Sequence, residues 1–204
     1  MGLAQPVPRL ADLEYLARER TAECKSEFFE GEVFAMSGGS LAHSLIATNL
    51  AAEFRRALRD RSCTPFNSDL RLKVEATGLL TYPDLSVICG PARFVDDEHD
   101  TVTNPTALAE VLSDSTESYD RGAKFRNYVQ IPTLREYLLV SQREPRVELF
   151  ARQEEGGPWV WREAVGLDAT LELPCLQVRI ALAEVFAKVP FEPVPLRRPT
   201  PRKE

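Results

Sequence analysis

Two carboxylates and one ammonium stand where this sequence could build a metal site. Asp84 opens an apolar stretch that ends at Cys89, and Glu110 interrupts a second apolar stretch, 107–113. Lys124 follows in a segment typical of a helix. A carboxylate in an apolar strand is costly to bury unless a cation or hydrogen-bond donors meet it. If the three groups converge, they predict a divalent-metal site for phosphodiester hydrolysis.

Such a site would divide the work among the three side chains. Because Mg²⁺ is held by one or two carboxylates and keeps several waters, Asp84 and Glu110 would be its ligands, with help from the carbonyl of Val111. Mn²⁺ is the alternative metal. Lys124 would orient the attacking water, favour its deprotonated form or stabilise charge on the phosphate. The residues by themselves leave another interpretation open, in which each acid caps a turn or pairs with a surface arginine.

The periodicity of apolar residues predicts the elements that must position these groups. Helices are expected at 12–20, 41–59, 116–130 and 182–188, with Ser40 and Thr116 as N-caps and Pro132 ending the third. Strands are expected at 27–36 (two strands around a turn at 30–32), 69–75, 79–82, 84–89, 107–113, 134–141, 146–152, 159–164, 170–173 and 177–180. This order predicts an α/β or α+β fold with a mixed central sheet flanked by helices.

Length and composition favour one soluble domain. The 204 residues suffice for a single core, predicted over 1–188, and the proline-rich segment 189–204 is expected to be extended or disordered. No apolar run has the length of a membrane span and no signal-peptide core is evident, so we expect a cytoplasmic protein without membrane contact.

The spacing of the cysteines and the net charge exclude some classes of protein and leave others open. Cys24, Cys63, Cys89 and Cys175 lack the spacing of a zinc site, and Cys89 and Cys175 are expected to be small buried hydrophobes in a reducing compartment. The net charge of −6 argues against strong nonspecific binding of nucleic acid, but it does not exclude a nuclease. The basic strip formed by Arg55, Arg56, Arg59 and Arg61 is interpreted as the solvated end of a helix.

Six segments, in this order, carry a resemblance to a known family. They are Glu27-Phe28-Phe29-Glu30-Gly31-Glu32, Asn67-Ser68-Asp69-Leu70-Arg71, Tyr82-Pro83-Asp84-Leu85-Ser86, Glu110-Val111-Leu112-Ser113, Tyr119-Asp120-Arg121-Gly122-Ala123-Lys124 and Glu136-Tyr137-Leu138-Leu139-Val140. Together they resemble the Uma family of restriction-endonuclease-like proteins, within the PD-(D/E)xK nuclease superfamily. Pro83-Asp84 matches the first half of that motif. Leucine stands at 112, where lysine is expected, and Lys124 fits the known variation in which the following helix supplies it.

The resemblance implies a restriction-endonuclease-like core, a divalent metal, DNA as substrate and a homodimer. It also draws attention to accessory candidates. Glu27 could approach the site from the N-terminal hairpin, and Asp69 is either a second acid near the metal or a turn residue at a strand start. His43 could make a helix-start hydrogen bond or touch a substrate phosphate. Arg121 could contact phosphate or pair with a neighbouring acid.

Two further interpretations belong to different classes of protein. One is a noncatalytic binding module that keeps the nuclease fold, which the acidic composition favours. The other, a hydrolase with a serine or cysteine nucleophile, is disfavoured because the sequence has no GxSxG elbow. The Gly38-Gly39-Ser40 loop could bind phosphate at a helix N-terminus or serve as a simple connection, since no GxxxxGK pattern is present.

Overall fold

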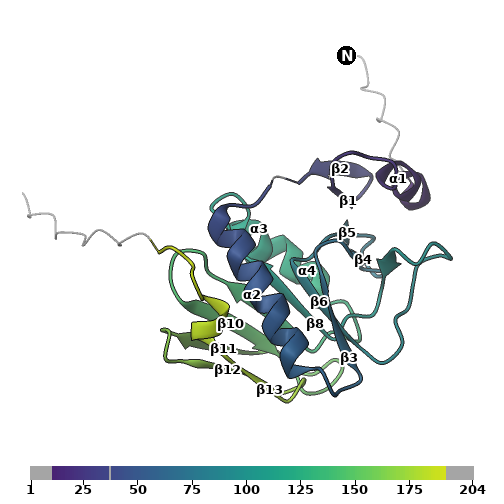
Figure 1. Cartoon of the computed structure of the whole chain (residues 1–204). Helices are drawn as coiled ribbons and strands as arrows, with labels where there is room; N and C mark the ends of the chain where they lie inside the picture. Colours follow the sequence, from purple (N-terminus) through teal and green to yellow (C-terminus); the bar gives the residue numbers. More distant parts are fainter. Residues whose placement is uncertain (1–10, 37, 192–204) are drawn as a thin grey trace, which may run out of the picture.

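A six-stranded mixed sheet forms the centre of the molecule. The computed structural model describes residues 11–36 and 38–191 (Figure 1). The strands, in spatial order, are β11 (Val160–Val165), β10 (Arg146–Ala151), β9 (Glu136–Val140), β8 (Ala107–Val111), β6 (Leu85–Cys89) and β3 (Cys63–Asn67). The β8–β9 pair is parallel and the other pairs are antiparallel. The predicted mixed central sheet is therefore confirmed.

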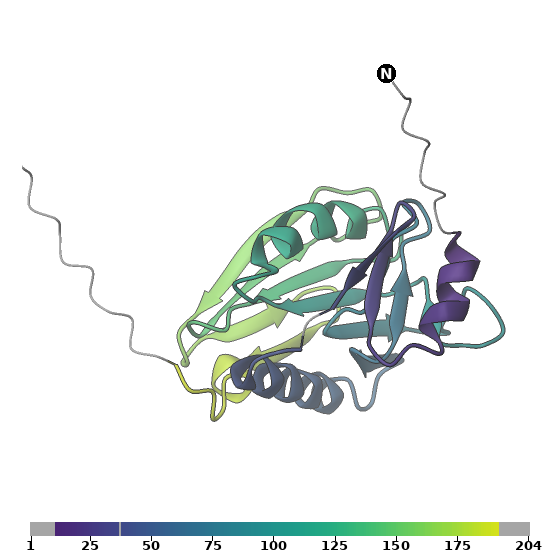
Figure 2. The same ribbon diagram turned by 90° about the horizontal axis from the view of Figure 1, so that it is seen from above.

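Helices lie over both faces of this sheet (Figure 2), and its central strands β8 and β9 are buried on both sides. On one face lie α2 (Leu41–Ala57), the hairpin of β12 (Thr170–Leu173) and β13 (Val178–Ala181), and α5 (Leu182–Val185). On the other face lies one helical segment composed of α3 (Glu117–Tyr119), η1 (Asp120–Lys124) and α4 (Phe125–Tyr128). Since side chains alternate along β8, Ala109 packs toward α2, whereas Leu108 and Leu112 pack toward α4. Glu110 is two residues from each of these leucines, so its side chain points to the same face, toward the α3–η1–α4 segment.

A second, smaller sheet sits beside the first. Its order is β2 (Glu32–Ala35), β1 (Ser26–Phe29), β5 (Leu80–Thr81), β4 (Arg71–Lys73) and β7 (Thr101–Val102), and α1 (Asp12–Glu19) packs on it through Tyr15 and Leu16. The β1–β2 turn has positive φ at Glu30 and at Gly31, a conformation that glycine adopts without steric cost. The chain runs from β5 directly into β6. Asp84 therefore stands at the junction of the two sheets.

Several local predictions are corrected by the structure. Strand β3 was not expected, and the helix expected at 116–130 contains the π-helical turn η1. Thr116 occupies the N-cap position but its side chain makes no capping hydrogen bond, and the Ser113 hydroxyl instead accepts from the Thr116 N–H at 3.2 Å. Val189 is buried against the core. Phe191 also packs against the core, and the part of the predicted tail from 192 to 204 lies outside the described residues.

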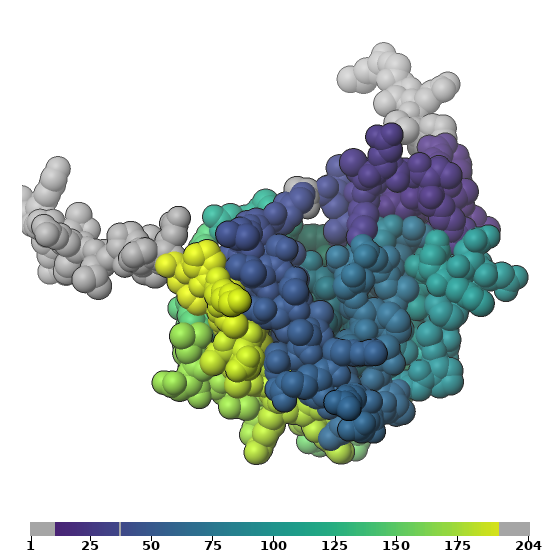
Figure 3. All heavy atoms as spheres, viewed as in Figure 1, coloured from purple at the N-terminus to yellow at the C-terminus, as the bar shows by residue number. Residues whose placement is uncertain are grey.

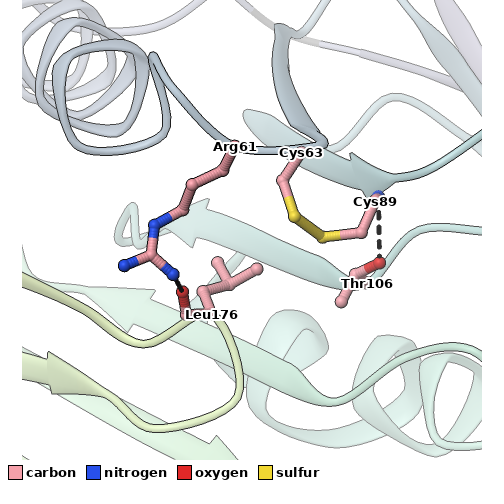
Figure 4. The surroundings of a disulfide bond; sticks show 5 residues. All are labelled: Arg61, Cys63, Cys89, Thr106 and Leu176. Atoms are coloured by element: carbon pink, nitrogen blue, oxygen red, sulfur yellow. Dashed lines mark hydrogen bonds between the residues drawn. A yellow bond between two sulfur atoms is a disulfide. The ribbon is translucent and has the colours of Figure 1, made fainter.

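A disulfide links the two strands at one edge of the central sheet. Cys63 of β3 and Cys89 of β6 are directly paired in register, with Cα atoms 3.9 Å apart, and their sulfurs are bonded (Figure 4). The expectation that Cys89 is a free buried thiol is wrong for this structure. Nearby, Arg61 Nη1 donates to the carbonyl of Leu176 at 3.0 Å, which ties the end of the expected basic strip to the β12–β13 hairpin. No helix in the described ranges is long and apolar enough to span a membrane.

Candidate active site

Asp84 and Glu110 come together because β6 and β8 are neighbours in the sheet. Leu85 pairs with Ala109 in antiparallel register, so the position before Leu85 lies opposite the position after Ala109. The carboxylate of Asp84 also accepts a hydrogen bond from the Val111 N–H, with Oδ2 2.7 Å from the nitrogen. Both acids line the same cleft. Both carboxylates therefore belong to one cleft, and their role as a pair of metal ligands stays a prediction.

Glu110 is an acid held in the interior, with 4% of its surface exposed. Its Oε1 accepts from the hydroxyl of Tyr128 at 2.7 Å and lies 3.0 Å from Lys124 Nζ. Burial raises the pKa of Glu110 to about 8, although the nearby ammonium of Lys124 opposes the shift. A second cation beside this carboxylate would favour its ionised form.

Lys124 projects from η1 into the same group of acids and is equally buried. Its Nζ lies 3.0 Å from Glu110, 3.1 Å from Glu27 and 3.6 Å from Asp120. Burial alone would lower the pKa of Lys124, but Glu110, then Glu27 and Asp120, more than offset that effect and raise it above its ordinary value. The ammonium is therefore a fixed positive charge in the site.

Glu27 reaches the site from β1, as the sequence allowed. Its Oε1 receives a hydrogen bond from the Thr81 hydroxyl as well as the contact from Lys124. Because β1 and β5 are neighbours in the smaller sheet, this carboxylate joins that sheet to the α3–η1–α4 segment.

His43 is the remaining accessory candidate that the structure places at the site. It lies in the first turn of α2, with Nε2 3.2 Å from Asp84 Oδ2. The hydrogen bond with Asp84 raises the pKa of His43, and partial burial opposes this. Helix α2 thus approaches Asp84 from the sheet face opposite to the one that Lys124 approaches.

Asp69 and Arg121 have their partners elsewhere. Asp69 is exposed and pairs with Lys25 at 2.6 Å. Arg121 lies at the cleft but is held by Glu148 at 2.6 Å and by Glu117 at 2.8 Å. Neither residue contacts the group of acids around Lys124.

Sequence reasoning missed two members of the site, Asp120 and Tyr128. Asp120 was considered only as a partner for Arg121, and the tyrosine was not considered. Both stand four residues from Lys124, and this spacing places side chains on one side of a helical segment. That spacing was the available signal, because three polar residues recur along one side of a segment that packs on a buried sheet.

These residues line an open cleft of about 2030 Å³. It is bordered by β2, the start of α2, the β9–β10 turn and residues 113–117. In the space-filling view, the purple N-terminal segment and the blue α2 lie on two sides of this recess (Figure 3). A molecule entering the cleft would meet Asp84 and Glu110 on its inner wall.

The two acids fit a hard divalent cation. The contacts of Asp84 fall on Oδ2 and those of Glu110 on Oε1, so within the described chain Oδ1 and Oε2 are left without a hydrogen-bond partner. No group of three or more His, Cys, Asp or Glu side chains in the described residues is arranged to hold a metal. Two carboxylates completed by water and substrate oxygens suit Mg²⁺ or Mn²⁺, whereas structural zinc needs a fuller protein shell.

The fold has a clear counterpart among solved structures. A crystal structure described as a putative nuclease belonging to DUF820, from Anabaena variabilis, superposes with a TM-score of 0.68 at 19% sequence identity. The match covers 87% of this chain and 98% of the other. The chain therefore shares the fold of that protein.

The family follows from sequence. The Uma2 family model, described as "Putative restriction endonuclease", matches residues 12–183, and the chain belongs to this family. Two proteins of Synechocystis are similar to it. Uncharacterized protein slr1290 is 37% identical over 91% of this chain and 96% of its own length, and uncharacterized protein sll1609 is 37% identical over 83% and 95%. The resemblance inferred from six short segments is confirmed.

Proposed function

We propose that this protein is a divalent-metal-dependent endonuclease that hydrolyses phosphodiester bonds in DNA. The observation that carries the proposal is the convergence of Asp84, Glu110 and Lys124 in one cleft, in a chain whose family is described as putative restriction endonucleases. Asp84 and Glu110 would hold Mg²⁺ or Mn²⁺. When bound, the metal would supply Lewis acidity toward the phosphate and lower the pKa of a coordinated water.

The protein's own groups divide the remaining work. Glu110 is fixed by Tyr128 and Lys124, and Asp84 is fixed by the Val111 N–H, so both ligands are oriented before substrate arrives. The Lys124 ammonium, held in its charged form, would orient the attacking water or stabilise charge on the transferred phosphate. Glu27 would hold this ammonium from its other side.

The charges of the cleft support dependence on a metal. Among the described residues, five lysine and arginine side chains line it, and each is already paired with an acid: Lys25, Arg121, Lys124, Arg143 and Arg146. A phosphate entering the cleft would have to compete with these acids for positive charge. A divalent cation at Asp84 and Glu110 would supply the charge that the paired side chains do not.

The pairing of the cleft's lysines and arginines with acids also favours a second candidate function, that of a noncatalytic interaction module that keeps the nuclease fold. Nicking of supercoiled plasmid with Mg²⁺ or Mn²⁺ separates the two. We expect wild-type protein to nick the plasmid, and Asp84→Asn, Glu110→Gln and Lys124→Met each to lose at least about 100-fold in rate. Asp69→Asn is the matched control, because its exposed carboxylate lies outside the site, and it should cleave as wild type does.

Two results would contradict the nuclease proposal. Cleavage that survives both Asp84→Asn and Lys124→Met would mean a contaminant or another site. Absence of cleavage by wild-type protein on supercoiled, linear and branched DNA, together with no binding of Mn²⁺, would favour the interaction module. The homodimer and the cytoplasmic location stay predictions, which sedimentation and cell fractionation would test.

A further inference from the structure

The start of α2 contacts Asp84 but takes no part in the hydrolysis described above. Its contact is made by His43, whose Nε2 is 3.2 Å from Asp84 Oδ2. The same oxygen accepts from the Val111 N–H at 2.7 Å. Two donors from different elements, α2 and β8, therefore meet one carboxylate oxygen. A carboxylate held in this way has little freedom to rotate, and its Oδ1 is left for another partner.

Gly39 makes room for the histidine. A Cβ built at this position would lie 2.8 Å from Nδ1 of His43 and 2.9 Å from its Cγ, closer than real side chains approach. The imidazole thus packs directly against the backbone of residue 39. Gly39 is not among the glycines with positive φ, so the position requires glycine for space and not for backbone conformation.

Ser40 and Gln142 fix the loop from the other side. The Ser40 hydroxyl accepts from the His43 N–H at 3.0 Å and donates to Oε1 of Gln142. Gln142 in turn donates from Nε2 to the carbonyl of Leu112 at 2.6 Å. Leu112 follows two residues after Glu110 in the chain. The start of α2 is therefore tied to the strand that carries the second acid of the site.

We propose that His43 is a positioning residue that holds Asp84 in the orientation needed to bind the divalent cation, and that Gly39, Ser40 and Gln142 hold His43 in place. The inference rests on the proposed function, because it assigns a role relative to the same cation. It gives the Gly38-Gly39-Ser40 loop a task other than binding phosphate. Groups that orient a metal ligand from behind typically contribute 10–100-fold to metal affinity or activity.

Two neighbouring glycines provide a matched test. Gly39→Ala forces the imidazole to move, whereas Gly38→Ala meets nothing within 4 Å and needs no unusual backbone. Mn²⁺ affinity, measured by electron paramagnetic resonance of the free ion, should fall about 10-fold in Gly39→Ala and stay at the wild-type value in Gly38→Ala. His43→Ala should show a loss at least as large, and His43→Gln a smaller one because the amide can still donate.

Nuclear magnetic resonance reports on the contact itself, without any activity. The chain has two histidines, and His99 lies in a distant loop where it packs on Phe94, so it serves as an internal reference. The ring resonances of His43 should shift in Gly39→Ala and in Asp84→Asn, and those of His99 should not. A folding defect would instead disturb the whole spectrum.

The outcomes separate this inference from the nuclease proposal. If wild-type protein nicks DNA while Gly39→Ala and Gly38→Ala bind Mn²⁺ equally well and leave the His43 resonances unchanged, the positioning role is overturned and the nuclease stands. If Gly39→Ala weakens Mn²⁺ binding and shifts His43 but wild-type protein cleaves no nucleic acid, the positioning role stands and the nuclease is overturned. Wild-type protein that binds no Mn²⁺ would overturn the positioning role.

Discussion

Glu136, at the start of β9, should make the stability of this protein fall as pH rises. The residue has 0% of its surface exposed. Its Oε1 accepts from the Cys175 N–H at 2.8 Å, and its Oε2 has no hydrogen-bond partner in the described part of the chain. Burial raises the pKa of this carboxyl from 4.5 to about 7, and the backbone hydrogen bonds only partly offset it.

The direction and magnitude of this change in stability follow from the linkage between proton binding and folding. Between pH 4.5 and about 7 the folded state keeps the proton of Glu136 while the unfolded chain has lost it. Stability therefore decreases with rising pH across this window, and above pH 7 the ionised group costs about 3 kcal/mol. Glu136→Gln keeps the shape and the acceptor for Cys175 but cannot ionise. The variant should match wild type near pH 4, below both pKa values, and exceed it by about 3 kcal/mol near pH 8.5.

Urea unfolding at both pH values measures this effect. The quantity of interest is the difference between variant and wild type, because the other titrating groups cancel in it. For a chain of this size the difference corresponds to roughly 6–12 °C in Tm. Glu155→Gln, on an exposed turn, is the control and should leave the pH dependence unchanged. A difference between Glu136→Gln and wild type that is equal at the two pH values would refute the assignment of the raised pKa to this group.

Three other changes test the packing around the site and the edge of the sheet. Lys124→Met leaves buried acids without their cation, so the free energy of unfolding should drop by about 3–5 kcal/mol, and added Mn²⁺ should restore part of it in a calorimetric scan. Tyr128→Phe removes a hydrogen bond to Glu110 and should cost about 1–3 kcal/mol in urea unfolding, with unchanged stability counting against that bond. Cys63→Ser opens a loop with a sequence separation of 26 and should cost about 3.5 kcal/mol. Reductant should destabilise wild type similarly and leave Cys63→Ser unaffected; equal stability with and without reductant in wild type would contradict the link.

The fold was predictable where local pattern and burial agree. Alternating or continuous apolar runs predicted β6, β8, β9 and β10, because these strands are covered by helices on both faces and contain few polar residues. Strand β3 was missed because Pro65 and neighbouring polar residues contradict strand propensity. It is the edge strand of the sheet, where proline is tolerated, and only its pairing with β6 reveals it.

The site was predictable in part for a similar reason. Asp84 and Glu110 interrupt apolar strands, so their cost of burial is visible in the sequence itself. His43 and Glu27 lie on elements far away in sequence, and only tertiary packing brings them to Asp84 and Lys124. Asp69 shows the converse, since it stands in a family-like segment but pairs with Lys25 outside the site.

The π-helical turn affects how the helical segment presents its side chains to the site. Asp120, Lys124 and Tyr128 recur at intervals of four, and all three are buried against the sheet. At about 3.6 residues per turn, positions four apart drift by about 40° around an α-helix, so three of them spread over about 80° but stay on one face. The wider turn of η1, with its i→i+5 hydrogen bonding, offsets this drift and aligns the series. A strictly α-helical segment over 116–130 would keep this polar row on one face but would spread its three side chains more widely around the helix axis.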